Sequence, residues 1–210
     1  MSARRLLLLL ATLAIATATA AVQADDLNPP PWRGQPGSTF QEWTFDTPDT
    51  SPTAVNNPYG TPTLTHQGVW QPGSISAPDL LFHIPNRPVL DPYKFIRIQV
   101  TSTSPAGVPS ELFVHIQAEP QASVVQTGWS GLLPADPTHP GSWYQWWDFT
   151  LKPNPRSEWI RITGSQNATW LTQFDQVVID TICPPVPEPM SMTLAGLGLM
   201  GVIGGRLRKR

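Results

Sequence analysis

Carboxylates are the side chains in this chain that could carry out hydrolysis, because a glycan-cleaving enzyme needs two acids held on either side of the bond that breaks. Six acids fall in strand-like segments: Glu42, Asp46, Asp148, Glu158, Asp175 and Asp180. Their spacing matches no catalytic motif, and the histidines at 66, 83, 115 and 139 are isolated. The chain also has no Gly-x-Ser-x-Gly elbow and no His-Glu-x-x-His zinc helix. We therefore expect a protein that is not an enzyme.

Four of these acids define a candidate metal site at the two ends of the central region. The first strand-like segment carries Glu42 and Asp46, and the last carries Asp175 and Asp180. The last segment resembles the Asp-containing closing strand of exported galactose-binding-like sandwiches, in which the terminal strands lie side by side. Oxygen ligands on such strands can hold a structural Ca²⁺, whereas acids on strand edges also discourage edge pairing. Beyond this calcium hypothesis, we expect no cofactor.

A repeated order of side chains indicates a surface for sugars. On three strand-like segments, the side opposite the aliphatic row carries an aromatic, then a cation or imidazole, then an amide or hydroxyl. The triplets are Phe95, Arg97 and Gln99; Phe113, His115 and Gln117; and Trp159, Arg161 and Thr163. If the segments share one sheet, the rings can stack on sugar faces while the polar groups bind hydroxyls. The alternative is that a loop or the N-terminal segment covers the rings.

Strands must position these side chains, because the central region has no helical periodicity. Runs rich in Val, Ile, Thr and aromatic residues are separated by turn residues, and 25 prolines would break most helices. The predicted strands cover residues 39–46, 80–84, 93–101, 112–119, 124–128, 143–151, 158–163 and 174–182, with a weaker strand at 64–70. Eight or nine short strands predict an all-β fold, a β-sandwich of the jelly-roll or galactose-binding-like kind.

The N-terminal part of the chain contains an export signal. Residues 1–24 place Arg4 and Arg5 before an apolar core and small residues, which is the layout of a secretory signal peptide. Cleavage after Ala20 or Ala24 fits this layout, and the acidic pair that follows Ala24 favours the second site. The proline-rich residues 25–38 are expected to form an extended arm. The sandwich domain is expected to cover residues 39–182.

Without its targeting sequences, the chain is acidic. Residues 25–187 keep 7 of the 13 Lys and Arg and 14 of the 15 Asp and Glu, which makes a net charge of −7. This balance argues against nucleic acid as a partner, because phosphates require a cationic surface. The single cysteine, Cys183, has no intramolecular partner. We interpret it as a passive thiol or as the site of an intermolecular disulfide.

The C-terminal tail has the layout of a membrane anchor. It contains a proline-rich linker (183–189), 16 uncharged residues (190–205) and a basic end (206–210). The uncharged stretch is at the short end for a transmembrane helix, which usually needs about 17–25 residues. The basic end is expected to stay cytoplasmic. This order of parts resembles the PEP-CTERM sorting signal of Gram-negative bacteria. The resemblance lies in Val186, Pro187, Glu188, Pro189, Arg206, Arg208, Lys209 and Arg210. It implies an exosortase-like partner that removes the tail, and an inner-membrane anchor before that step.

These observations predict an exported, non-catalytic protein of the cell envelope or extracellular matrix. The resemblance implies an association with exopolysaccharide and biofilm, and therefore polysaccharide as a further partner. The first alternative is a carbohydrate-binding module that uses an aromatic sheet face, which requires open rings. The second is a glycan-active hydrolase or lyase, which requires two carboxyl groups about 5–10 Å apart in a cleft.

Overall fold

A computed structural model describes residues 26–88, 91–103, 111–135, 141–164 and 171–184. The predicted signal peptide, the Val-Pro-Glu-Pro box, the apolar segment 190–205 and the basic end lie outside the described residues. Within the described ranges, no helix has the length and apolar character needed to cross a membrane.

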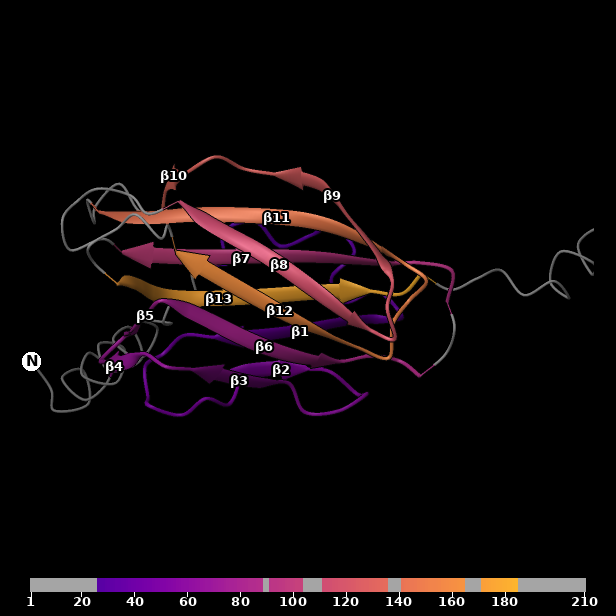
Figure 1. Ribbon diagram of the computed structural model, residues 1–210, viewed down its shortest axis with the longest axis horizontal. Helices are drawn as coiled ribbons and strands as arrows, with labels where there is room; N and C mark the ends of the chain where they lie inside the picture. Colours follow the sequence, from indigo (N-terminus) through magenta and orange to yellow (C-terminus); the bar gives the residue numbers. More distant parts are fainter. Residues whose placement is uncertain (1–25, 89–90, 104–110, 136–140, 165–170, 185–210) are drawn as a thin grey trace, which may run out of the picture.

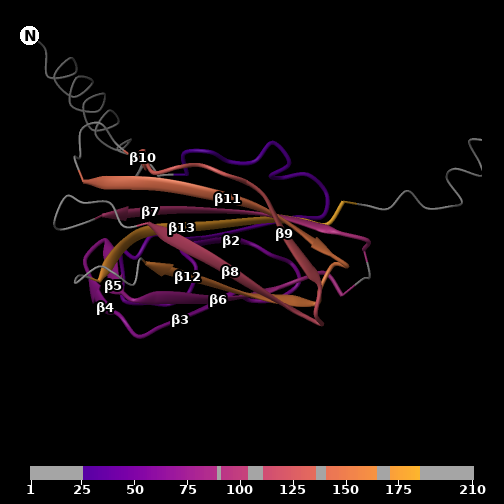
Figure 2. The same ribbon diagram turned by 45° about the horizontal axis from the view of Figure 1, so that its top comes forward.

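Two antiparallel sheets pack face to face (Figures 1 and 2). Sheet A contains β1 (Ser38–Trp43), β2 (Ala54–Asn56), β4 (Val69–Gln71), β5 (Ser74–Ala77), β7 (Lys94–Thr103), β9 (Ser123–Trp129), β10 (Leu133–Pro134), β11 (Ser142–Lys152) and β13 (Thr172–Ile182). Sheet B has the order β3 (Thr63–His66), β6 (Asp79–Pro85), β12 (Ser157–Gly164), β8 (Leu112–Glu119). The predicted all-β sandwich is confirmed.

The core lies between the sheets and is built from the aliphatic rows of the strands. Alternation along β7 and β12 turns Ile98 and Ile160 inward, and both are fully buried. Large rings fill the space between the sheets: Trp43 of sheet A lies 4.7 Å, centroid to centroid, from Phe82 of sheet B. The outward-facing residues of each strand are therefore left to form two separate surfaces, one on each sheet.

The first and last strands are neighbours, as expected. β1 pairs with β13 from Ser38 opposite Ile182 to Trp43 opposite Val177. On its other side β13 pairs with β7, so the strand that leads to the C-terminal tail is central in sheet A. One further hydrogen bond, from the Cys183 amide to the Gly37 carbonyl (3.2 Å), extends the β1–β13 contact beyond the strands.

The proline-rich segment before β1 crosses the outer face of sheet A (the indigo trace above β11 in Figure 2). An extended arm was expected over residues 25–38, but turns occupy residues 31–37 and β1 begins at Ser38. Backbone hydrogen bonds from Arg33 to Pro30 and from Gln35 to Trp32 close these turns. Polar and charged side chains hold this segment on sheet A: Arg33 donates a hydrogen bond to Asp180, and Asp26 accepts one from Gln99.

Candidate functional site: the outer face of sheet B

The pairing of β8, β12 and β6 places three rows of side chains next to one another on the outer face of sheet B. Residues directly opposite one another on antiparallel strands share a face, with Cβ atoms about 4.5–5.5 Å apart. The rows, which together we call the sheet B face, are Phe113, Thr163 and Asp79; His115, Arg161 and Leu81; and Gln117, Trp159 and His83. Four of the six predicted sugar-binding residues therefore lie together: Phe113, His115, Trp159 and Arg161.

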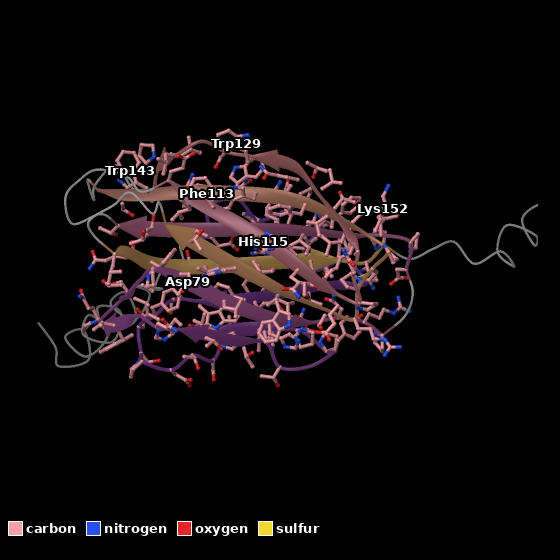
Figure 3. The ribbon with its side chains drawn as sticks, in the orientation of Figure 1. Asp79, Phe113, His115, Trp129, Trp143 and Lys152 are labelled. Carbon is pink, nitrogen blue, oxygen red and sulfur yellow. The ribbon has the colours of Figure 1, made fainter. Side chains whose placement is uncertain are left out.

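The sheet B face is open to solvent. Phe113 is 53% exposed, and His115 and Gln117 are also exposed (Figure 3). Trp159 is half-buried because its ring lies against the imidazole of His83, with 4.6 Å between the ring centroids. The Arg161 side chain is 57% exposed. Its Nε donates a hydrogen bond to Asp79 Oδ2 (2.7 Å), which fixes the guanidinium against the sheet.

This arrangement suits a ligand that has both apolar and hydroxyl-bearing faces. The ring of Phe113 and the Trp159–His83 pair offer apolar surfaces, while Arg161, His115 and Gln117 offer donors and acceptors between them. Sequence reasoning identified the residues of β8 and β12 but missed Asp79, Leu81 and His83 on β6. The signal for Leu81 and His83 was present, because alternate residues of the predicted strand 80–84 share a face, whereas Asp79 lies just outside the predicted bounds.

Phe95 and Arg97 do not belong to this surface, so the interpretation of six residues in one patch is wrong. Both lie on β7, which is in sheet A, and they point away from the core on the opposite side of the sandwich. Alternation correctly predicted which side of β7 faces outward. It carries no information on which sheet a strand joins, because that depends on pairing with distant segments.

An ion-pair network occupies the outer face of sheet A around Arg97. Its guanidinium makes two hydrogen bonds of 2.7 Å to the Asp148 carboxylate and lies 4.8 Å from the centre of the Trp146 ring. The hydrogen bond to Asp148 raises the pKa of Arg97, which is half-buried. These contacts consume the donors that a sugar would use.

The N-terminal segment covers this network. Arg33 binds both carboxylate oxygens of Asp180 and also pairs with Asp26. The side-chain nitrogen of Gln99 donates a hydrogen bond to Asp26, and its side-chain oxygen accepts one from the backbone amide of Asn28. Both donor–acceptor distances are about 3 Å. The N-terminal segment therefore covers Arg97 and Gln99. Phe95 lies at the edge of this segment and stays 37% exposed.

The four candidate calcium ligands are not brought together. Glu42 accepts a hydrogen bond from Gln176 (2.6 Å), and Asp46 accepts one from Thr44 (2.7 Å). Asp175 accepts one from Thr103, and Asp180 is held by Arg33. Among the residues that the structure describes, no group of three or more His, Cys, Asp or Glu has an arrangement suited to a metal ion.

A buried ion pair that the sequence reasoning missed connects the two sheets. Lys94 of β7 and Glu158 of β12 are both fully buried, with Nζ and Oε1 2.5 Å apart. Asn86 completes the cluster through hydrogen bonds to both charged groups. Alternation along the two strands indicated that both charges face inward, because Lys94 lies in the inward row of Ile96 and Glu158 in that of Ile160.

Cys183 lies in the folded domain rather than in an exposed linker. Its side chain is only 3% exposed, and burial raises its pKa to about 11. A thiol in this position cannot reach a second molecule while the domain is folded, which corrects the interpretation of Cys183 as the site of an intermolecular disulfide. The remaining interpretation, a passive thiol, agrees with its burial.

Comparisons with known proteins identify the tail. Residues 185–209 match the family model of the PEP-CTERM protein-sorting motif. No curated protein matches the chain. Among solved structures, the chain is similar to "CBM35 from Cellvibrio japonicus Abf62" with a TM-score of 0.33 and 9% identity, over 71% of this chain and 99% of that one. That likeness is too weak to bear on function.

The match confirms the predicted resemblance at the C-terminus. The chain carries the sorting motif of an exported protein that an exosortase processes, held before processing as a membrane-anchored precursor and sorted to the cell surface. The motif concerns the tail and leaves the task of the sandwich to be inferred from the sheet B face.

Proposed function

We propose that the sandwich is a non-catalytic exopolysaccharide-binding domain, which the sorting system delivers to the envelope or extracellular matrix of a Gram-negative bacterium. The observation that carries this proposal is the open sheet B face, where exposed Phe113 and the Trp159–His83 pair flank the donors of Arg161 and Gln117. An association with biofilm follows from this binding, because a matrix polymer would be the ligand that the surface-sorted protein meets.

Binding at a single face is expected to be weak. Aromatic contacts contribute about 0.5–1.5 kcal/mol beyond the area that they bury, and the face offers two such platforms, Phe113 and Trp159. Many copies at the cell surface would bind one polymer at several points, and the resulting avidity can exceed a single affinity by about 10²–10⁴. Retention on a polymer is therefore a better measurement than binding of a short oligosaccharide.

The alternative function, a glycan hydrolase or lyase, finds less support. Glycoside hydrolysis needs two carboxyl groups free to exchange protons with substrate. Glu158 is fully buried against Lys94, Asp148 is held by Arg97, and Asp180 is held by Arg33. We propose that the domain needs no cofactor; an unchanged melting temperature in chelator would agree, and a lower one would restore the calcium hypothesis.

The finer fold class and the anchor are also part of this proposal. We assign the sandwich to the jelly-roll or galactose-binding-like class, with the adjacent terminal strands β1 and β13 as support. We assign residues 190–205 to a transmembrane helix that holds the precursor in the inner membrane, on the basis of their apolar sequence and the basic residues that follow.

The test is retention of the mature protein, recovered from its host, on immobilised host exopolysaccharide. Trp159→Ala and Phe113→Ala should each reduce retention, because each removes one stacking surface from the sheet B face. Their matched control is Phe95→Ala, which removes a partly exposed ring from sheet A. Equal retention of wild type and of folded Trp159→Ala and Phe113→Ala variants would contradict the proposal.

A further inference from the structure

The cations of the described chain divide into two groups. Arg33, Lys94, Arg97 and Arg161 each form an ion pair with an acid. The other three, Arg87, Lys152 and Arg156, form no ion pair with another described residue. Lys152 and Arg156 are exposed, and Arg87 is half-buried. We call these three residues the exit cations, because all of them lie at the end of the sandwich from which the chain leaves toward its tail.

Hydrogen bonds and electrostatics place the exit cations together. The Arg156 carbonyl accepts from the Asn86 amide (2.9 Å), so Arg156 lies beside the residue that precedes Arg87. Arg87 is close enough to Cys183 to lower the pKa of that thiol, although burial outweighs this effect. Lys152 ends β11 and lies at the same end (Figure 3).

Exposed charge at this end is positive although the domain is acidic. The Arg156 amide donates to the carbonyl of Glu119, which is the exposed acid in these loops, while Asp91 and Glu158 are buried. The opposite end, where β8 begins and β1 ends, carries the exposed acids Glu111, Asp46 and Asp49 in the described part of the chain. The surface charge is therefore polarised along the long axis, with its positive pole at the chain exit.

The length of chain beyond this end limits its distance from a membrane. Pro184 is the last residue described, and the apolar segment begins six residues later at Met190. At about 3.3–3.6 Å per residue, six residues span at most about 22 Å. When residues 190–205 cross the bilayer, the exit cations are held close to its surface.

We propose that Arg87, Lys152 and Arg156 dock the precursor on anionic lipid headgroups. Cations near an anionic surface gain about 1 kcal/mol each, within a Debye length of about 8 Å. Docking by this end stands the strands upright on the membrane and leaves the sheet B face open to the side. The inference rests on the membrane-spanning tail of the proposed function but not on glycan binding.

The test uses the full chain inserted through its tail into vesicles of phosphatidylcholine, or of equal parts phosphatidylcholine and phosphatidylglycerol. Backbone hydrogen exchange at the amides of Lys152, Asn154, Arg156 and Ser157 should be slower in the anionic vesicles, by roughly fivefold for each cation that reaches the surface; the two prolines between them have no amide hydrogen. High salt should remove the difference, because it screens the attraction.

Variants decide whether the exit cations are responsible. The combined change Arg87→Gln, Lys152→Gln and Arg156→Gln should equalise exchange in the two vesicles, while Arg161→Gln, which removes an exposed cation of the sheet B face, should leave the difference intact. Equal exchange of the wild-type loop in both vesicles would overturn the proposal, as would a chain that fails to float with either one. Exopolysaccharide retention is measured separately, so equal exchange in the two vesicles leaves the glycan-binding proposal standing, whereas failure to float contradicts the proposed membrane anchor.

Discussion

Arg33 is the residue through which the N-terminal segment is held on sheet A. It binds both oxygens of Asp180, whose side chain is fully buried, and its own guanidinium lies 4.3 Å from the centre of the Phe40 ring. Burial raises the pKa of Asp180, and the hydrogen bond from Arg33 acts in the opposite direction. The charged form of Asp180 thus depends on Arg33.

Removal of that partner should be strongly destabilising. Arg33→Gln leaves a buried carboxylate without its cation, and breaking such a pair costs about 3–5 kcal/mol. We expect a loss near the lower value, because the Arg33 side chain is 22% exposed. Urea unfolding measures it. Arg33→Gln combined with Asp180→Asn should recover part of the loss, and a double variant as unstable as the single one would contradict this account.

The pH dependence of the Arg33→Gln variant follows from the same pair. Without Arg33, only Arg97 and Gln99 still oppose the effect of burial on Asp180, so its pKa rises further above the unfolded value. A raised carboxyl pKa favours the folded state at low pH, and this contribution is lost as pH rises through the folded pKa. The stability difference between wild type and variant should therefore shrink as pH falls, and a difference that grew on acidification would contradict it.

Cys183 predicts a second pH dependence of stability, at alkaline pH. Its pKa is raised from 9.0 to about 11 in the folded state, so the thiol ionises first in the unfolded chain. Stability should therefore fall as pH rises from about 9 to 11, by about 2–3 kcal/mol at about 1.36 per pKa unit. The measurement is the free energy of unfolding at pH 8 and 10.5. Cys183→Ala should lose less over this interval, and equal losses would show that another group is responsible.

At the scale of elements, the junction between the N-terminal segment and β1 depends on a glycine. Gly37 has φ of 85°, and a Cβ there would lie 2.7 Å from the Cys183 carbonyl oxygen. Gly34 has nearly the same φ, 79°, but a Cβ there would meet no atom within 4 Å. Alanine substitutions at Gly34 and Gly37 therefore separate the energetic penalty of the backbone conformation from that of the steric clash with Cys183.

Gly34→Ala should destabilise the domain by about 1–2 kcal/mol, the penalty for a left-handed conformation of a residue with a Cβ. Gly37→Ala carries the same penalty and adds a clash, for which overpacking suggests about 1–3 kcal/mol more. Thermal or urea unfolding of the two variants measures the difference. Equal stabilities of the two variants would mean that the contact between Gly37 and Cys183 can open without loss of folding free energy.

The elements could be predicted from sequence because their signal is local. The segment 112–119 alternates so regularly that β8 has the predicted bounds, whereas β2, β5 and β10 have four residues or fewer and are too short for alternation to be seen. The segment 64–70 contains two strands, β3 and β4, because the chain turns between His66 and Val69.

The site could be predicted only in part, because its assembly is not local. Arg97 and Arg161 each follow an aromatic residue in the outward row of their strand. Pairing with distant strands nevertheless places them on opposite sides of the sandwich. Arg97 then meets Asp148 and the N-terminal segment, while Arg161 meets Asp79 and solvent. Alternation specifies the face of a strand, and long-range pairing specifies its neighbours.

At the scale of the whole molecule, processing should be separable from folding. Replacement of Pro187, Glu188 and Pro189 by Ala should leave the tail attached, because the change removes the matched sorting box. The free energy of unfolding should not change, because the described sandwich ends before the box. Intact mass of envelope material measures tail retention. Wild-type protein that kept residues 206–210 in a host with an active exosortase would contradict the assignment.

The central position of β13 has a mechanical consequence. Any tension applied at the C-terminus enters the domain through β13, which is antiparallel to β1 on one side and to β7 on the other. Pulling along this strand loads two ladders of hydrogen bonds at once in shear, whereas an edge strand would be held by one ladder only. A domain tethered in flowing liquid by this end would therefore yield last at its point of attachment.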